Sequence, residues 1–269
     1  MKNSNNGVSA SYHSFLRSPH QALKVSSYFP VYDRLLDCYR GREVTFVEIG
    51  VLGGGSLFMW RDFLGPKARI IGVDLNPAAK KWEAYGFEIF IGSQSDRSFW
   101  QQFCEAVGEI DIVLDDGGHT YEQQIITVEE LAPSIADGGI LIVEDTHTSY
   151  MSGFGPKKYS FINYAKNKAD AINFRHSELS GSPEYRFWSI EFFESIVAFK
   201  INKKFSSING VRQVNGGLDD AAVDFRYEYK PKNQPFYIRA LRSIPVRGKL
   251  GKLLKSLITH LEFSCRKHF

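Results

Sequence analysis

VTFVEIGVLGGGSLFMWRDF, residues 44–63, is the stretch that decides the fold. Residues 44–49 are mostly apolar, as in a buried strand, and residues 50–55 form a glycine-rich turn. Residues 56–63 have the composition of a helix that a serine caps. The stretch therefore predicts a strand, a glycine loop and a helix in succession.

The same alternation continues along the chain. Apolar runs and segments with helical spacing follow one another as strand 69–74, helix 78–85, strand 87–91, helix 98–107, strand 110–114, helix 121–136 and strand 139–143. Strands that alternate with helices of this length predict a parallel, doubly wound sheet that binds ligands at the carboxyl ends of its strands.

Segments on either side complete the predicted fold. Residues 22–39 have helical spacing, whereas residues 1–20 are polar and expected to be loose. Residues 159–171 resemble a helix, and the strand-like runs 187–193 and 195–201 are close enough to form a hairpin. The predicted fold class is α/β: a Rossmann-like, doubly wound, mostly parallel seven-stranded sheet with an antiparallel edge hairpin, an N-terminal helical segment and a basic C-terminal tail. The predicted boundaries are 1–40, 41–203 and 204–269.

The composition of the chain narrows the class of protein. It has 269 residues, of which 43% are hydrophobic and 14% aromatic, as in ordinary globular proteins. Cys38, Cys104 and Cys265 are far apart, which indicates neither a zinc site nor a disulfide framework and fits a reducing cytoplasm. The N-terminus lacks the apolar core of a signal peptide, and no apolar run approaches the roughly 20 residues of a membrane helix.

The glycine loop indicates a cofactor that contains a nucleoside. Glycine lets the backbone approach a ligand, and an acid after the second strand, here Asp74, can accept hydrogen bonds from ribose hydroxyls. NAD is disfavoured because its fingerprint requires glycine where Leu52 stands. The cofactor that the loop indicates in place of NAD is S-adenosylmethionine. The remaining possibility is that the loop binds no cofactor and is a purely structural glycine turn beside a buried Glu48. The residues expected to bind the cofactor are Glu48, Gly50, Gly53, Ser56, Asp74, Ser93, Gln94 and Asp115.

Three carboxylates follow two of the predicted strands. Asp116 ends one strand, and Glu144 and Asp145 end the other. If these strands are neighbours, the acids share one edge of the sheet. Clustered and partly buried negative charges are unfavourable unless a cation compensates them. Carboxylate oxygens are the ligands that Mg²⁺ prefers, so Asp116, Glu144 and Asp145 are predicted to bind it. Otherwise such acids merely cap helices or face water.

His119 lies three residues after Asp116, with two glycines between them. A histidine is a suitable general base when it faces a hydroxyl proton, whereas a lone histidine is more often structural. His147 permits another interpretation, in which His119, Asp145 and His147 form the two-histidine, one-carboxylate iron site of an oxygenase. That interpretation leaves Asp116 and Glu144 without a role.

Four motifs resemble those of metal-dependent class I methyltransferases, of the type that methylates macrolide sugars and rhamnosyl groups. The motifs are VEIGVLGGGSLFMWR at 47–61, GVDLNP at 72–77, LDDGGH at 114–119 and VEDTHTSY at 143–150. The resemblance covers residues from about 20 to 201. Proteins similar to these are often labelled cephalosporin hydroxylases, a name that the predicted magnesium site does not support.

The resemblance implies an S-adenosylmethionine-dependent methyltransferase domain over residues 41–203. It implies O-methylation of a sugar hydroxyl of a glycoside or glycan, with Mg²⁺ on Asp116, Glu144 and Asp145 and with His119 as the base. It also implies that Lys24 and Tyr28 of the N-terminal segment contribute to the site. A non-catalytic glycan-binding relative with the same fold is a further possibility.

The basic tail suggests additional partners. The formal net charge is +3, but residues 229–269 carry ten Lys and Arg against one acid, Glu262. Residues 244–261 have the pattern of an amphipathic basic helix, which would pack on the body or on another subunit, or would lie on a membrane surface. We expect a homo-oligomer in the cytoplasm that can contact the inner membrane face. Nucleic acid is not expected, because no aromatic residues accompany the charges.

Overall fold

The structure is a computed structural model that describes residues 9–217 and 248–264. The chain divides into two compact units, Met1–Arg212 and Gln213–Phe269. The first unit contains the sheet, and the described part of the second contains the helix α9 (Gly248–Ser264). Within the described residues, no helix combines the length and the apolar composition needed to span a membrane.

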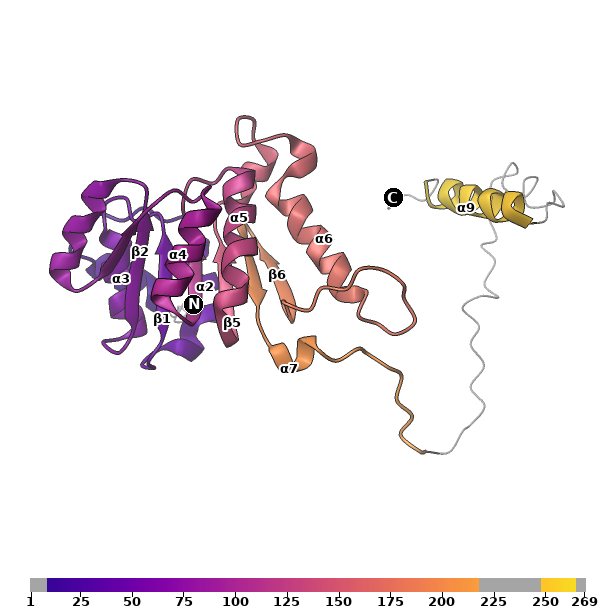
Figure 1. The fold of residues 1–269 in the computed structure, drawn as a ribbon, viewed down its shortest axis with the longest axis horizontal. Helices are drawn as coiled ribbons and strands as arrows, with labels where there is room; N and C mark the ends of the chain where they lie inside the picture. Colours follow the sequence, from indigo (N-terminus) through magenta and orange to yellow (C-terminus); the bar gives the residue numbers. More distant parts are fainter. Residues whose placement is uncertain (1–8, 218–247, 265–269) are drawn as a thin grey trace, which may run out of the picture. The chain divides into compact units, whose positions relative to one another are not determined.

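The sheet of the first unit has seven strands (Figure 1). Their order across the sheet is β3 (Glu88–Ile91), β2 (Arg69–Asp74), β1 (Thr45–Ile49), β4 (Ile110–Asp115), β5 (Ile135–Val143), β7 (Ile196–Lys200) and β6 (Ser189–Phe193). The strands β1 to β5 are parallel to one another, and β7 is antiparallel to both β5 and β6. This arrangement confirms the predicted mostly parallel sheet with an antiparallel hairpin at its edge.

Helices cover both faces of the sheet. The first unit contains α1 (Ala10–Arg17), α2 (Tyr28–Leu36), α3 (Gly55–Leu64), α4 (Arg97–Val107), α5 (Tyr121–Leu131), α6 (Phe161–Asn173) and α7 (Lys203–Ser206). Short 3₁₀ helices lie at η1 (Asp37–Tyr39), η2 (Pro77–Tyr85), η3 (Ala132–Ser134), η4 (Thr146–Tyr150) and η5 (Lys157–Tyr159). Figure 1 shows α4 and α5 side by side in front of the sheet.

Alternate residues of each strand face different cores, as the two-residue period of a strand requires. In β1, Phe46 packs in one core with residues of α2, α3 and η2, whereas its neighbour Val47 packs in the other with residues of α4, α5 and α6. Trp60 and Trp100 are the largest fully buried side chains, one in each core. Burial on both faces fixes the sheet and therefore the positions of its strand ends.

The N-terminal segment differs from its prediction in two places. Residues 10–17, expected to be loose, form α1, whose first two N–H groups, of Ala10 and Ser11, donate to the Asp33 carboxylate over 2.9 Å each. The helix expected over 22–39 begins only at Tyr28. Pro30 explains the late start, because proline is tolerated in the first turn of a helix but not in its interior. Residues 18–27 are therefore free to run across the carboxyl edge of the sheet.

Candidate active site

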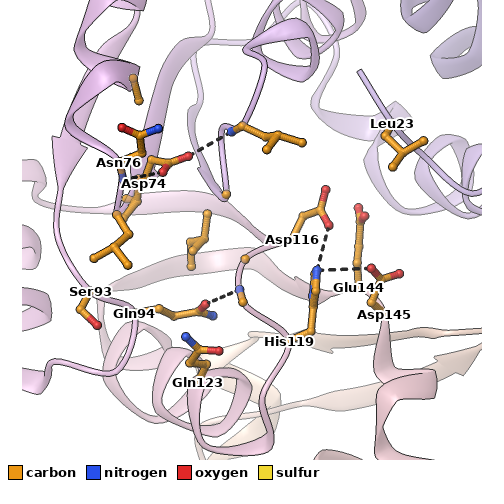
Figure 2. Close-up of a pocket in the computed structure, with 18 of the residues that line it drawn as sticks. Leu23, Asp74, Asn76, Ser93, Gln94, Asp116, His119, Gln123, Glu144 and Asp145 are labelled. Atoms are coloured by element: carbon orange, nitrogen blue, oxygen red, sulfur yellow. Dashed lines mark hydrogen bonds and ion pairs between the residues drawn. The ribbon is translucent and has the colours of Figure 1, made fainter. Parts of the chain in front are cut away.

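A pocket of about 730 Å³ opens at the carboxyl ends of β1, β2, β4 and β5. Its walls come from the loops that follow these strands, from the turn after β3 and from the segment before α2. Figure 2 shows Asp74 and Ser93 on one side of the pocket and His119 and Asp145 on the other. One cavity thus joins the glycine loop to the acidic residues.

The glycine loop is held by its neighbours. Gly50 has a φ of +90°, and a Cβ there would lie 2.1 Å from the carbonyl oxygen of Asp116, so only glycine lets the two loops pack together. Asp74 Oδ2 accepts hydrogen bonds from the N–H groups of Val51 and Leu52, at 2.9 and 3.0 Å. The end of β2 therefore fixes the loop that follows β1.

The predicted cofactor residues fall into two groups. Gly50, Asp74, Ser93 and Gln94 line the pocket. The other four, Glu48, Gly53, Ser56 and Asp115, are absent from its lining. The pocket also has lining residues that the sequence interpretation did not single out, such as Asn76, Lys81 and Gln123.

Two buried carboxyls hold the residues behind this wall in place. Glu48 accepts hydrogen bonds from Ser56 Oγ at 2.7 Å and from Trp60 Nε1 at 3.0 Å. Both oxygens of Asp115 accept from Gln94 Nε2, at 2.7 and 2.8 Å. Burial raises the pKa of Glu48 to about 7 and that of Asp115 to about 6. Both acids thus support the pocket wall from inside the protein.

Adjacent strands bring the predicted metal ligands together. The N–H of Asp116 donates to the carbonyl of Ile49 at 3.0 Å, and the N–H of Glu144 donates to the carbonyl of Asp115 at 2.9 Å. These bonds continue the β1–β4–β5 ladder by one residue, so the side chains that follow emerge at one edge. We call Glu48, Asp116, Glu144 and Asp145 the acidic centre.

A lysine from the N-terminal segment enters the acidic centre. Lys24 Nζ lies 2.7 Å from Asp116 Oδ2, 3.1 Å from Glu144 Oε2 and 3.7 Å from Glu48 Oε1, and only 1% of its side chain is exposed. Burial alone would lower the pKa of this ammonium, but the carboxylates of Glu144, Asp116 and Glu48 raise it above its ordinary value. Lys24 is therefore protonated at neutral pH.

Two tyrosines of α2 also contact the acidic centre. Tyr32 Oη donates to Glu144 Oε1 and Tyr28 Oη donates to Asp145 Oδ1, both over 2.5 Å. Burial raises the pKa of both phenols, and the adjacent carboxylates raise it further. Burial likewise raises the pKa of Glu144 to about 8, against the attraction of Lys24. Both oxygens of Glu144 are thus engaged, by Lys24 and Tyr32.

His119 faces the remaining carboxylate oxygens. Its Nε2 lies 3.4 Å from Asp145 Oδ2 and 3.9 Å from Asp116 Oδ1. Both His119 and Asp145 have left-handed backbone conformations, with φ of +58° and +53°. Such values are uncommon outside glycine and cluster at functional sites. The backbone therefore adopts unfavourable conformations where these side chains converge.

Asp116, His119 and Asp145 could hold a metal ion, since each offers one ligand atom and these atoms lie within 4.8 Å of one another. The donors suit a divalent cation, and the group differs from the predicted trio in having His119 in place of Glu144. His147, the third ligand of the alternative iron site, is outside the group; its Nδ1 lies 3.9 Å from Asp145 Oδ1, the oxygen that Tyr28 contacts.

Comparisons with known proteins show which proteins the chain resembles. A family model described as a methyltransferase domain matches residues 47–146. The chain is 31% identical over 202 residues to the mycinamicin VI 2''-O-methyltransferase of Micromonospora griseorubida, covering 70% of this chain and 49% of that protein. It is 34% identical over 137 residues to a rhamnosyl tetracenomycin-C 2'-O-methyltransferase of Streptomyces olivaceus, covering 48% and 36% of the two chains.

A solved structure has the same fold. It is the methyltransferase MycE in complex with Mg, SAH and mycinamycin VI, with a TM-score of 0.62 and 27% identity over 72% of this chain and 52% of MycE. The present chain thus spans about half the length, or less, of the curated relatives that it matches. Residues 47–146 form a methyltransferase domain, and the chain is a relative of the macrolide-sugar O-methyltransferases in sequence and in fold.

Proposed function

We propose that the protein is an S-adenosylmethionine- and Mg²⁺-dependent O-methyltransferase that acts on a sugar hydroxyl of a glycoside or glycan. One observation carries this proposal. A single pocket joins a wall suited to a nucleoside, which includes Gly50 and Asp74, to a wall that carries His119 and three acids, Asp116, Glu144 and Asp145. A methyl donor and a hydroxyl acceptor can therefore meet inside it, and holding two reactants in the right geometry removes a large part of the barrier to a two-substrate reaction.

The cofactor is assigned to the glycine-loop side of the pocket. Asp74 can accept hydrogen bonds from the ribose, and Ser93 and Gln94 border the position of the adenine in this proposal. Glu48 and Asp115 contribute indirectly, because they hold Ser56 and Gln94. Leu52 and Leu75 lie beside Asp74 with 85% and 72% exposed and offer apolar contacts at the rim.

The cation is assigned to the acidic centre. When bound, Mg²⁺ makes a coordinated hydroxyl more acidic and neutralises developing charge. Asp116 and Asp145 would hold it, because Lys24 and Tyr28 contact only one oxygen of each of these carboxylates. Glu144 would join them only if it exchanged its contacts with Lys24 and Tyr32 for the cation.

His119 is assigned as the general base. Its Nε2, which faces the carboxylates of Asp116 and Asp145, removes the proton of the sugar hydroxyl. The reaction forms a bond between the sugar oxygen and the methyl carbon, while the bond between that carbon and sulfur breaks. Its products are the methyl ether and S-adenosylhomocysteine.

Titration calorimetry with S-adenosylhomocysteine, followed by methyl-transfer assays on a panel of glycosides, tests the proposal. We expect cofactor binding, turnover of at least one glycoside, and loss of turnover in EDTA that Mg²⁺ restores. Full activity in EDTA would exclude the role of the metal. Cofactor binding without turnover of any glycoside would instead favour a glycan-binding relative, and oxygen consumption with Fe²⁺ would favour the oxygenase.

The C-terminal helix bears on the choice of acceptor. In α9, Leu253 and Leu257 are 68% and 52% exposed, as expected for a helix with an unburied apolar side. If the acceptor glycan is lipid-linked, this helix would hold the enzyme at the membrane surface. Flotation of the full chain with anionic liposomes tests this part, and assembly into a homo-oligomer is tested by light scattering.

A further inference from the structure

Lys24 occupies an unusual environment for a lysine. Its ammonium faces carboxylates that come from three different strands, at Glu48 in β1, at Asp116 after β4 and at Glu144 after β5. A buried lysine is uncommon because removing its charge from water is costly unless opposite charges compensate. Here the side chain is buried, and every one of its ion pairs points into the acidic centre.

The acidic centre contains more acidic groups than positively charged ones. It contains four carboxyls, two of which, those of Glu48 and Glu144, are fully buried. Tyr28 and Tyr32 donate hydrogen bonds to it but carry no charge. Within the described residues, the ion pairs given to the centre by Lys or Arg all come from Lys24, and the other partners are His119 and His147. Lys24 is therefore its permanent positive charge.

The positive charge of Lys24 comes from a segment that is not part of the sheet. Lys24 lies in the segment 18–27, which runs beside the glycine loop. Ser18 Oγ donates to the carbonyl of Gly55 at 2.8 Å, and a Cβ at Gly55 would lie 2.3 Å from the carbonyl of His20. Close packing against the loop thus places the lysine, which lies in a stretch, residues 21–25, without regular secondary structure.

We propose that Lys24 is a built-in counter-ion that stabilises the acidic centre by itself and competes with a divalent cation for it. The inference rests on the proposed function, because it assumes that the centre binds a cation. It assigns Lys24 as a positioning residue that sets how tightly the metal is held. Lys24 lowers the negative potential that attracts the cation, and it contacts Asp116 and Glu144, two of the expected ligands.

A purely structural role predicts something different. Lys168 forms comparable ion pairs, 2.9 Å from Glu129 and 3.4 Å from Glu184, in a network that lies outside the pocket lining. Loss of either lysine should lower the stability of the fold. Only loss of Lys24 should change the response to a divalent cation, so Lys168→Met is the matched control.

The test uses the full chain as wild type and as Lys24→Met, Lys24→Arg and Lys168→Met. Thermal unfolding is followed in EDTA and with Mg²⁺ or Mn²⁺, and the Kd of Mn²⁺ is measured by calorimetry without cofactor or acceptor. We expect Lys24→Met to unfold at a lower temperature than wild type in EDTA, and its unfolding temperature should rise more than that of wild type when the cation is added. It should also bind Mn²⁺ about tenfold more tightly, since a unit positive charge a few ångströms from the cation is removed. Lys24→Arg should resemble wild type, and Lys168→Met should be less stable with an unchanged Kd.

Two outcomes overturn the inference in distinguishable ways. If wild type binds Mn²⁺ and Lys24→Met binds it equally or more weakly, Lys24 does not compete with the cation. If neither binds Mg²⁺ or Mn²⁺, the metal dependence of the proposed function fails, and the inference fails with it.

If Lys24→Met folds poorly, a second pair of variants tests the same proposal. The single variant Glu144→Gln is compared with the double variant that carries both Lys24→Met and Glu144→Gln. These two variants differ only at Lys24, and the double variant loses one positive and one negative charge, so its net charge is unchanged from wild type. The double variant should bind Mn²⁺ more tightly than Glu144→Gln alone, and equal or weaker binding would contradict the proposal.

Discussion

At the scale of single residues, His119 carries the chemical step of the proposed function. We expect His119→Asn to lower kcat by about 10²- to 10⁴-fold, the usual contribution of a general base. Asparagine is the suitable replacement, since it tolerates the left-handed backbone that His119 adopts at φ +58°. The affinity for S-adenosylhomocysteine should stay unchanged, because Asp74 and Ser93 line another side of the pocket.

His147 supplies the matched control for this variant. It is a histidine near the same carboxylate, Asp145, but 48% of its side chain is exposed and it does not line the pocket. His147→Asn should therefore keep its turnover. Wild-type kcat in His119→Asn would remove the base assignment, and an equal loss in both variants would indicate that either substitution merely disturbs Asp145.

The acids of the site could be predicted from sequence, whereas their partners could not. Asp116, Glu144 and Asp145 lie within two residues of the ends of apolar runs, and parallel strand ends meet at one edge, so the local pattern is enough to group them. Lys24 contacts Glu144 across 120 positions of the chain and lies in a segment without regular secondary structure. No periodicity marks such a residue, and only the family resemblance pointed to it and to Tyr28.

At the scale of elements, an ion-pair network joins α5, α6 and the segment before β6. Glu129 of α5 accepts hydrogen bonds from Arg186 Nη1 at 2.6 Å and from Tyr164 Oη at 2.5 Å, and Lys168 lies 2.9 Å away. Although burial opposes it, these partners lower the pKa of Glu129 to about 2. The network therefore favours the ionised carboxylate in the folded protein.

This network predicts a pH-dependent effect of Glu129→Gln. Because the folded pKa is lower than the ordinary one of about 4.3, the ionised carboxylate stabilises the fold fully above that ordinary value. Its contribution is lost as the pH falls towards 2. At pH 7 the substitution should reduce the free energy of unfolding by about 1 to 2 kcal/mol, a range that allows for solvent screening.

Urea denaturation of wild type and Glu129→Gln from pH 7 to 3 measures this difference. The two curves should converge as the solution becomes acidic. Glu105→Gln, on an exposed position of α4, is the control and should match wild type throughout. A difference between Glu129→Gln and wild type that stays constant from pH 7 to 3 would contradict the ionic origin of the effect.

At the scale of the whole molecule, the sequence predicted the class of sheet but not the place of every strand. The hairpin was expected at the edge, yet its second strand, β7, is the one that pairs with β5. Burial explains this order, since Ile196 to Phe199 of β7 are fully buried, whereas β6 retains Glu191 and a half-exposed Phe192. A continuously apolar strand belongs inside a sheet, but which of two hairpin strands pairs inward depends on the rest of the fold.

The division into two units leads to a prediction about the complete chain. The pocket is lined by residues between Leu23 and Asp145, and both cores of the sheet lie within Met1–Arg212. A chain that ends at Arg212 should therefore fold, unfold at the same temperature and bind S-adenosylhomocysteine with an unchanged Kd. Differential scanning calorimetry and titration calorimetry of the two chains measure this. A lower unfolding midpoint or weaker cofactor binding in the shortened chain would mean that the methyltransferase domain depends on residues 213–269. If the shortened chain is unchanged in both respects but no longer floats with anionic liposomes, residues 213–269 are the part that binds the membrane surface.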